Sequence, residues 1–143
     1  MGVIRKYTRL SVMERKMINE LMIKQLYFSL LIHFFPFSRL KPYLGIPGNE
    51  EDKATNEHDE QYLRLVLKNF WRVKKHLPFK MKCFAEALAV KSVLRKNQIP
   101  STLLLGVKKE MDKLSAHAWL KQGEAIIIGK KAAKEYTPVG IFT

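Results

Sequence analysis

The hydrophobic pattern of this chain changes in character about halfway along. In the first half, apolar residues recur at helical spacing over residues 11–35 and again over 57–76. The first of these segments opens with Ser11-Val12-Met13-Glu14, which has the form of a capping box, and Pro36 ends it. A shorter helix is expected over 37–45. The first half of the chain is therefore predicted to be helical.

The second half predicts one helix followed by short strands. The composition becomes helical at Cys83, and Pro100 forbids continuation of that helix. Strands are expected over 101–107, 114–121 and 124–128, with a polar turn at 108–113 and a further edge strand near the C-terminal end. Gln122-Gly123 reads as the tight turn of an antiparallel hairpin. Helices followed by a helix that feeds an antiparallel sheet form an α+β arrangement.

The length of 143 residues predicts a single domain, residues 1–143. Within it we expect an N-terminal helical part, 1–60, and a C-terminal core, 77–143. Residues 1–10 are basic and expected to be loosely ordered. Residues 46–52 form a turn-rich, acidic segment that we interpret as a loop inside the domain.

Composition narrows the class of protein. A hydrophobic fraction of 47% fits a globular protein and argues against disorder. The single cysteine excludes an internal disulfide and a Cys-rich zinc site, and His58 and His76 have no partners at metal-ligand spacing. No metal or cofactor is expected. Cations precede any apolar run and no cleavage site follows, so no signal peptide is predicted, and a cytoplasmic location is the simplest interpretation.

The formal net charge of +13 favours acidic or polyanionic partners. The cations are scattered and accompany no nucleic-acid-binding motif, so a nucleic-acid partner is not expected. The apolar run at 26–35 is too short to span a bilayer, which needs about 20 residues. It predicts either a helix buried against the domain or one that contacts a membrane surface or a partner, with Lys24, Arg39 and Lys41 at its margins.

Candidate chemistry centres on Cys83 and His117. A thiol at a helix N-terminus meets free backbone N–H groups, its own included, that stabilise a thiolate or an oxyanion, and Lys80 and Lys82 are expected to act in the same direction. A histidine on a neighbouring strand can accept the thiol proton. The alternative is that Cys83 is a buried small hydrophobic residue. Trp119, on the same strand face as His117, is either core or a wall of the site.

Three blocks of the second half resemble a known family. They are Lys82-Cys83-Phe84-Ala85-Glu86-Ala87, then Leu103-Leu104-Leu105-Gly106-Val107, then Ser115-Ala116-His117-Ala118-Trp119. Their order and spacing are similar to those of the leader peptidase of lasso-peptide biosynthesis, in particular the stand-alone peptidase half of its split form. The resemblance implies a transglutaminase-like, papain-related cysteine peptidase fold, with Cys83 as the nucleophile and His117 as the base.

The same resemblance implies a substrate and partners. The enzyme would cut a ribosomally made precursor peptide between leader and core, and an ATP-dependent macrolactam cyclase, the lasso cyclase, would then use the released amine. In the split form a separate small protein binds the leader and delivers it. This chain shows no obvious room for that domain, so such a partner is expected.

The sequence departs from the family pattern at the third catalytic position. The family often carries an Asp on the strand after the His, whereas that strand here contains no carboxylate. In the expected register His117 pairs with about Ile128, and Glu124 lies roughly 13 Å away. Asp112 and Glu135 are loop candidates. The third member therefore stays unknown: a backbone carbonyl orients His117, or the register is wrong, or the site is a dyad.

Two other functions compete with this interpretation. One is another transglutaminase-like amide hydrolase or acyl transferase. The other is a non-catalytic, basic docking protein that holds an acidic partner or a membrane surface, in which Cys83 would be unreactive.

Overall fold

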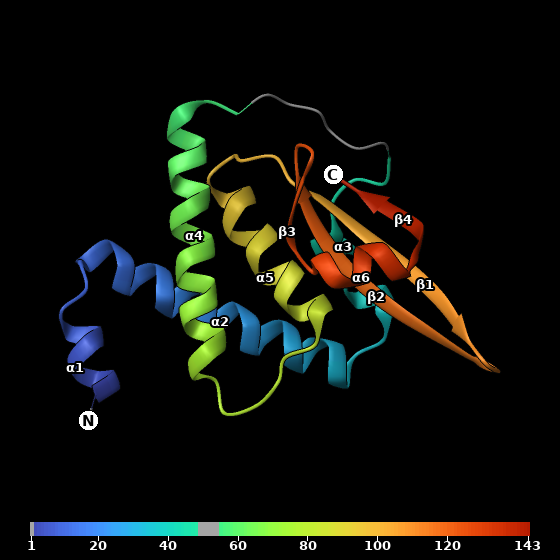
Figure 1. Ribbon diagram of the computed structural model, residues 1–143, viewed down its shortest axis with the longest axis horizontal. Coiled ribbons are helices and arrows are strands. Elements are labelled where there is room, and N and C mark those ends of the chain that lie inside the picture. The colour runs from blue at the N-terminus through green and yellow to red at the C-terminus, as the bar shows by residue number, and fades with distance from the viewer. Residues whose placement is uncertain (1, 49–54) are drawn as a thin grey trace.

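The structure is a computed structural model that describes residues 2–48 and 55–143 (Figure 1). Its helices are α1 (Gly2–Thr8), α2 (Val12–Phe34), the 3-10 helix η1 (Phe37–Arg39), α3 (Lys41–Leu44), α4 (Glu57–His76), α5 (Cys83–Lys96) and α6 (Lys130–Glu135). Its strands are β1 (Thr102–Glu110), β2 (Lys113–Gln122), β3 (Ala125–Ile128) and β4 (Thr137–Phe142). The α+β arrangement predicted from the sequence is confirmed.

Helix α2 begins and ends where its local signals predict. The Ser11 hydroxyl accepts a hydrogen bond from the Glu14 N–H at 3.1 Å, and the Glu14 carboxylate accepts one from the Ser11 N–H at 3.3 Å, which completes the capping box. One stripe of the helix is buried, while the opposite stripe is exposed. The apolar run is therefore only half buried against the domain.

Helix α5 forms the centre of the molecule, and α4 packs on its outer side (Figure 1). The Asn56 side chain caps α4 by accepting from the Asp59 N–H at 2.8 Å. Helix α5 lies between α4 and the sheet (Figure 1) and is the most buried of the described helices. Its alanines allow close packing, and with Leu88, Val93 and Leu94 they join the main hydrophobic core.

The four strands form one antiparallel sheet in the order β3-β2-β1-β4. Strand β1 extends to Glu110 and strand β2 begins at Lys113. Most of the segment predicted as a polar turn, residues 108–113, is therefore strand. The expected C-terminal edge strand is present as β4, beside β1. Helix α6 was not predicted, because its short, mostly polar sequence has no apolar period.

The sheet separates two hydrophobic clusters. Ala118 and Leu120 of β2 join the main core with α5, whereas Trp119 packs with Leu104 and Tyr136 in a small cluster on the other face. Trp119 is therefore core. Gly106 on β1 makes this packing possible, because a Cβ there would lie 2.6 Å from the Trp119 ring.

The N-terminal segment differs from its prediction. Residues 2–8 form helix α1 rather than a loosely ordered arm, and the Tyr7 hydroxyl donates to Asn19 of α2 at 2.9 Å. In the predicted acidic loop, Ile46 exchanges two backbone hydrogen bonds with Thr143. Residues 49–52 of that loop lie outside the described residues. None of the described helices is long and apolar enough to cross a membrane.

Candidate active site

Cys83 is the first residue of α5. Lys82 before it is extended and offers no side-chain cap, so the first N–H groups of the helix have no intrahelical partner. The thiol is half-buried at this helix end. The backbone N–H groups of Phe84 and of Cys83 itself act on the thiol and lower its pKa. The predicted helix N-terminus around the thiol is therefore present.

His117 lies on β2, beyond the point where β3 stops pairing with that strand. It pairs with Gly106 of β1 on its other side. Its Nδ1 accepts a hydrogen bond from the Ala118 backbone N–H at 3.1 Å, so in the neutral ring the hydrogen is on Nε2 and the single Nδ1 lone pair points at this N–H. Its ring meets that of Tyr136 edge to face, with centroids 5.2 Å apart.

The Ala118 N–H acts on both candidate residues. This donor serves the His117 imidazole, and it also acts on the Cys83 thiol and lowers its pKa. Cys83 approaches from the face covered by α5, and His117 is held on the opposite face beside Tyr136. The structure thus brings the only thiol of the chain and an unprotonated imidazole nitrogen to one backbone amide at the edge of β2.

The electrostatic balance at the thiol differs from the prediction. Burial is the largest influence and raises the pKa of Cys83 above its ordinary value, and the Glu86 carboxylate one turn along α5 raises it further. The N–H groups of Ala118, Phe84 and Cys83 lower it without reversing the balance. Lys80 and Lys82 are not among the main causes of this shift.

The register of the β2–β3 hairpin also differs from the prediction. Gln122 pairs with Ala125, and after a bulge Leu120 pairs with Ile128, so Ile128 does not face His117. The turn lies at residues 123–124, one position later than predicted. This shift carries the end of β3 away from His117.

The described residues place no carboxylate in a hydrogen bond with His117. Glu124 lies in the turn between β2 and β3, and Asp112 lies in the turn between β1 and β2. Glu135 pairs with Lys108 at 3.4 Å. The residue that does contact the imidazole is Tyr136. No spacing in the sequence identifies it, because it reaches His117 only through the packing of the segment after α6.

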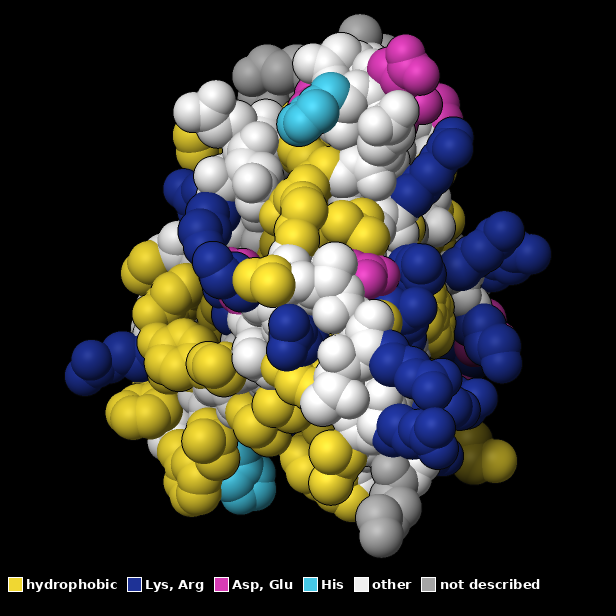
Figure 2. All heavy atoms as spheres, turned by 90° about the vertical axis from the view of Figure 1, so that its left-hand side faces the viewer, with side chains coloured by type: hydrophobic (Ala, Val, Ile, Leu, Met, Phe, Trp, Pro, Cys, Tyr) yellow, Lys and Arg dark blue, Asp and Glu magenta, His cyan; other side chains and the backbone are white. Residues whose placement is uncertain are grey.

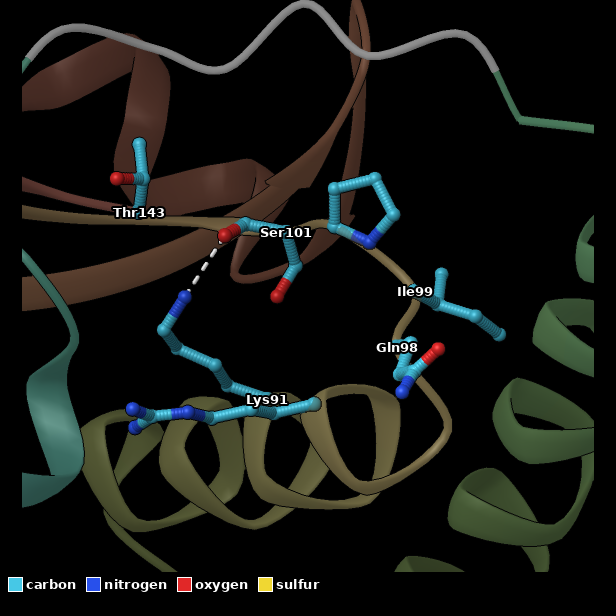
Figure 3. Close-up of a pocket in the computed structure, with 7 residues that line it drawn as sticks. Lys91, Gln98, Ile99, Ser101 and Thr143 are labelled. Carbon is cyan, nitrogen blue, oxygen red and sulfur yellow. Dashed lines mark hydrogen bonds between the residues drawn. The ribbon is translucent and has the colours of Figure 1, made fainter.

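A separate small cavity of about 190 Å³ lies at the other end of α5 (Figure 3). Its buried lysine, Lys91, donates to the Ser101 carbonyl at 2.7 Å, and Gln98 and Thr143 also line it. Lys91 is two turns of helix beyond Cys83, so this cavity is not part of the Cys83 site. No group of three or more His, Cys, Asp or Glu side chains in the described parts of the chain could hold a metal.

Comparison with known proteins places this architecture in a family. A family model described as the transglutaminase-like superfamily matches residues 24–140, a span that includes α5, the sheet and both candidate residues. The chain belongs to the transglutaminase-like superfamily, whose members are commonly cysteine peptidases or transferases. No curated protein and no solved structure gave a significant match. The predicted transglutaminase-like fold is therefore confirmed.

Proposed function

We propose that this protein is a cysteine peptidase that removes the leader from a lasso-type precursor peptide. The observation that supports the chemistry is that one backbone N–H, that of Ala118, donates to His117 Nδ1 and also lowers the pKa of the Cys83 thiol. Membership of the transglutaminase-like superfamily supports a thiol enzyme. The substrate class rests on the resemblance of the Cys83, Gly106 and His117 blocks to the leader peptidases of lasso-peptide biosynthesis.

The proposed reaction uses groups at this site only. His117 Nδ1 releases the Ala118 N–H that it accepts in the resting site and takes the thiol proton as the Cys83 sulfur bonds to the scissile carbonyl carbon. The first N–H groups of α5 stabilise the oxyanion. The C–N bond then breaks, and the imidazolium gives its proton to the leaving core amine. Water, deprotonated by His117, hydrolyses the thioester and releases the leader carboxylate.

The raised pKa of Cys83 bears on the first step. At neutral pH the resting thiol is protonated, so the site supports proton transfer to His117 during attack rather than a preformed thiolate. Activity should rise further as pH increases toward this raised pKa, because the thiolate that forms there attacks without first transferring a proton.

The proposal includes partners and a location. The precursor peptide, a small leader-binding protein and the lasso cyclase would act with this chain in the cytoplasm. The core 77–143 would carry the chemistry within a single domain of residues 1–143. The precursor and a leader-binding protein are therefore the reagents for a test.

The decisive experiment incubates the chain with a lasso-type precursor and its leader-binding protein in water labelled with heavy oxygen. We expect mass spectrometry to find a free core amine and one heavy oxygen in the leader carboxylate. Cys83→Ala and His117→Ala should lose cleavage while their circular dichroism and melting temperature stay near wild type. Cleavage that survives Cys83→Ala would refute the mechanism. Transfer of the acyl group to an added amine, without heavy oxygen, would instead identify an acyl transferase.

One observation favours a second candidate, the non-catalytic docking protein. Burial and Glu86 both raise the pKa of Cys83, as expected for a thiol that serves only packing. The two candidates differ in reactivity toward substrate. The docking protein would bind an acidic partner or membrane surface but form no thioester with an activated leader peptide, even at alkaline pH.

A further inference from the structure

Helix α2 exposes an apolar stripe opposite the stripe that it buries. Ile23, Leu30 and Phe34 are 63%, 57% and 69% exposed and follow helical spacing along one face. Leu26 and Tyr27 lie on the same face and are also exposed. Figure 2 shows hydrophobic side chains gathered at the lower left of one side of the molecule, with Lys and Arg side chains gathered at its right. A contiguous exposed patch of this kind marks an interaction site.

Aromatic side chains extend this stripe past the end of α2. Phe35, Phe37 and Tyr43 are all exposed. The Tyr43 hydroxyl is 2.7 Å from that of Tyr27, so one of these two hydroxyls donates a hydrogen bond to the other. We call the surface formed by these exposed residues the α2 face: Ile23, Leu26, Tyr27, Leu30, Phe34, Phe35, Phe37 and Tyr43.

The segment that forms the α2 face carries cations but no carboxylate. Residues 21–48 contain no Asp or Glu, and Arg39 and Lys41 are exposed at its aromatic end. At the opposite end, a groove of about 700 Å³ opens between α1, α2 and α4. Met22 lines this groove next to the α2 face, and exposed Lys6 and Arg9 line it too. The apolar surface therefore has cations at both ends.

We propose that the α2 face docks on an anionic phospholipid bilayer. An interfacial helix inserts an apolar stripe at the headgroup boundary and places Lys and Arg against anionic lipid, which is the distribution found on and around α2. A protein interface of this size would also offer hydrogen-bonding groups, about one per 100–200 Å². The α2 face pairs its two tyrosine hydroxyls internally, which favours lipid over protein.

The test is sedimentation of the full chain with vesicles of phosphatidylcholine alone or mixed equally with phosphatidylglycerol. We expect binding to the anionic vesicles at low salt and little to the neutral ones. The double variant Arg39→Gln/Lys41→Gln should partition about twenty-five-fold more weakly, fivefold for each charge. Its matched control, Lys113→Gln/Lys131→Gln, removes two exposed cations elsewhere and should change partitioning far less.

Apolar variants test the orientation. Leu30→Gln/Phe34→Gln should weaken binding by about tenfold or more, because two anchoring side chains are lost from the bilayer boundary. The control Leu114→Gln/Val139→Gln alters two equally exposed apolar residues of the sheet and should bind as wild type. Circular dichroism checks that each variant is folded.

Several results would overturn the proposal. The chain could ignore anionic vesicles at low salt, or both control pairs could weaken binding as much as the α2 pairs. The Leu30/Phe34 variant could instead abolish a dimer in sedimentation velocity, which would assign the face to a second copy of this chain. It could also leave vesicle binding intact and block only partner-dependent cleavage, which would assign the face to a protein partner. Vesicle binding by the inactive Cys83→Ala chain keeps this test separate from the peptidase proposal.

Discussion

Opposing influences act on the thiol of Cys83. Burial and the Glu86 carboxylate raise its pKa, while three backbone N–H groups lower it. Glu86 is itself buried and forms an ion pair with Lys74 at 3.1 Å. A negative charge one helical turn from the sulfur disfavours the thiolate, so Glu86 adds to the larger effect of burial in raising the pKa of Cys83.

Replacing Glu86 by Gln should therefore lower the pKa of Cys83. The variant keeps the shape of the side chain and removes its charge, and the thiolate then forms at lower pH. Iodoacetamide alkylation followed against pH measures this cleanly, because Cys83 is the only cysteine. We expect the midpoint of the wild-type chain to lie above that of an ordinary thiol and that of Glu86→Gln to lie below wild type. The exposed Glu60→Gln is the control, and an equal midpoint in Glu86→Gln and wild type would contradict the assignment.

Tyr136 takes the place of the carboxylate that would otherwise orient His117. It does so by packing against the imidazole rather than by hydrogen bonding to it. Its ring contacts the imidazole at 5.2 Å, and its hydroxyl is 3.2 Å from Ser115 rather than bonded to His117. The ring, rather than the hydroxyl, should therefore position the base.

Tyr136→Leu should lower kcat by about tenfold to a hundredfold, because a misplaced base loses its alignment with the thiol. KM should change little, and Tyr136→Phe should restore most of kcat because it keeps the ring. Steady-state kinetics with the precursor as substrate separates the change in kcat from the change in KM. The measurements are made well below the melting temperature of each variant. Equal losses in the Phe and Leu variants would show that the hydroxyl matters instead.

At the scale of elements, the predictions that succeeded rest on local signals. The Ser11 capping box, Pro36 and the Asn56 cap define helix ends through neighbouring residues alone. The β2–β3 register failed because a turn displaced by one residue, together with a bulge, changes every pairing beyond it. This is why the residue facing His117 was misplaced.

The site could be predicted only in part for a related reason. Cys83 and His117 stand out as residue types, one at a helix start and one on a strand. The contact between His117 and Tyr136 joins segments on either side of β3 and α6, so it depends on tertiary packing. The raised pKa of Cys83 depends mainly on burial. Burial cannot be predicted from the positions of nearby lysines in the sequence.

Gln25 is a packing feature of α2 that the apolar pattern did not reveal. Its side chain is fully buried, and neither its amide nitrogen nor its carbonyl oxygen has a hydrogen-bond partner among the described residues. A buried polar group without a partner costs free energy, because folding removes its hydrogen bonds to water. Gln25 therefore lowers the stability of the helix packing.

Gln25→Met should raise the free energy of unfolding by about 1–2 kcal/mol, because it keeps the length of the side chain and removes the unpaired polar atoms. Urea unfolding followed by circular dichroism measures the change. Gln61→Met on the exposed side of α4 is the matched control and should stay within about 0.5 kcal/mol of wild type. A destabilised Gln25→Met would indicate a hydrogen-bond partner for this amide.

At the scale of the whole molecule, 26 cationic side chains face only 13 acidic ones. Several of the acidic groups are used to hold elements together, as when Glu14 of α2 meets Arg72 of α4 at 3.1 Å. Exposed ion pairs of this kind contribute about 0–1 kcal/mol each. A net charge of +13 on so small a chain leaves repulsion between cations as the larger electrostatic effect.

Added salt should therefore stabilise this protein. Screening weakens attraction and repulsion alike, but repulsion exceeds attraction here, so the melting temperature should rise as sodium chloride is added. The rise should level off near about 0.2 M, where the Debye length falls below about 8 Å. A general salting effect would continue linearly to higher concentration, which scanning calorimetry over a salt series distinguishes. A melting temperature that falls over the first additions would mean that the ion pairs, Glu14–Arg72 among them, contribute more than the repulsion costs.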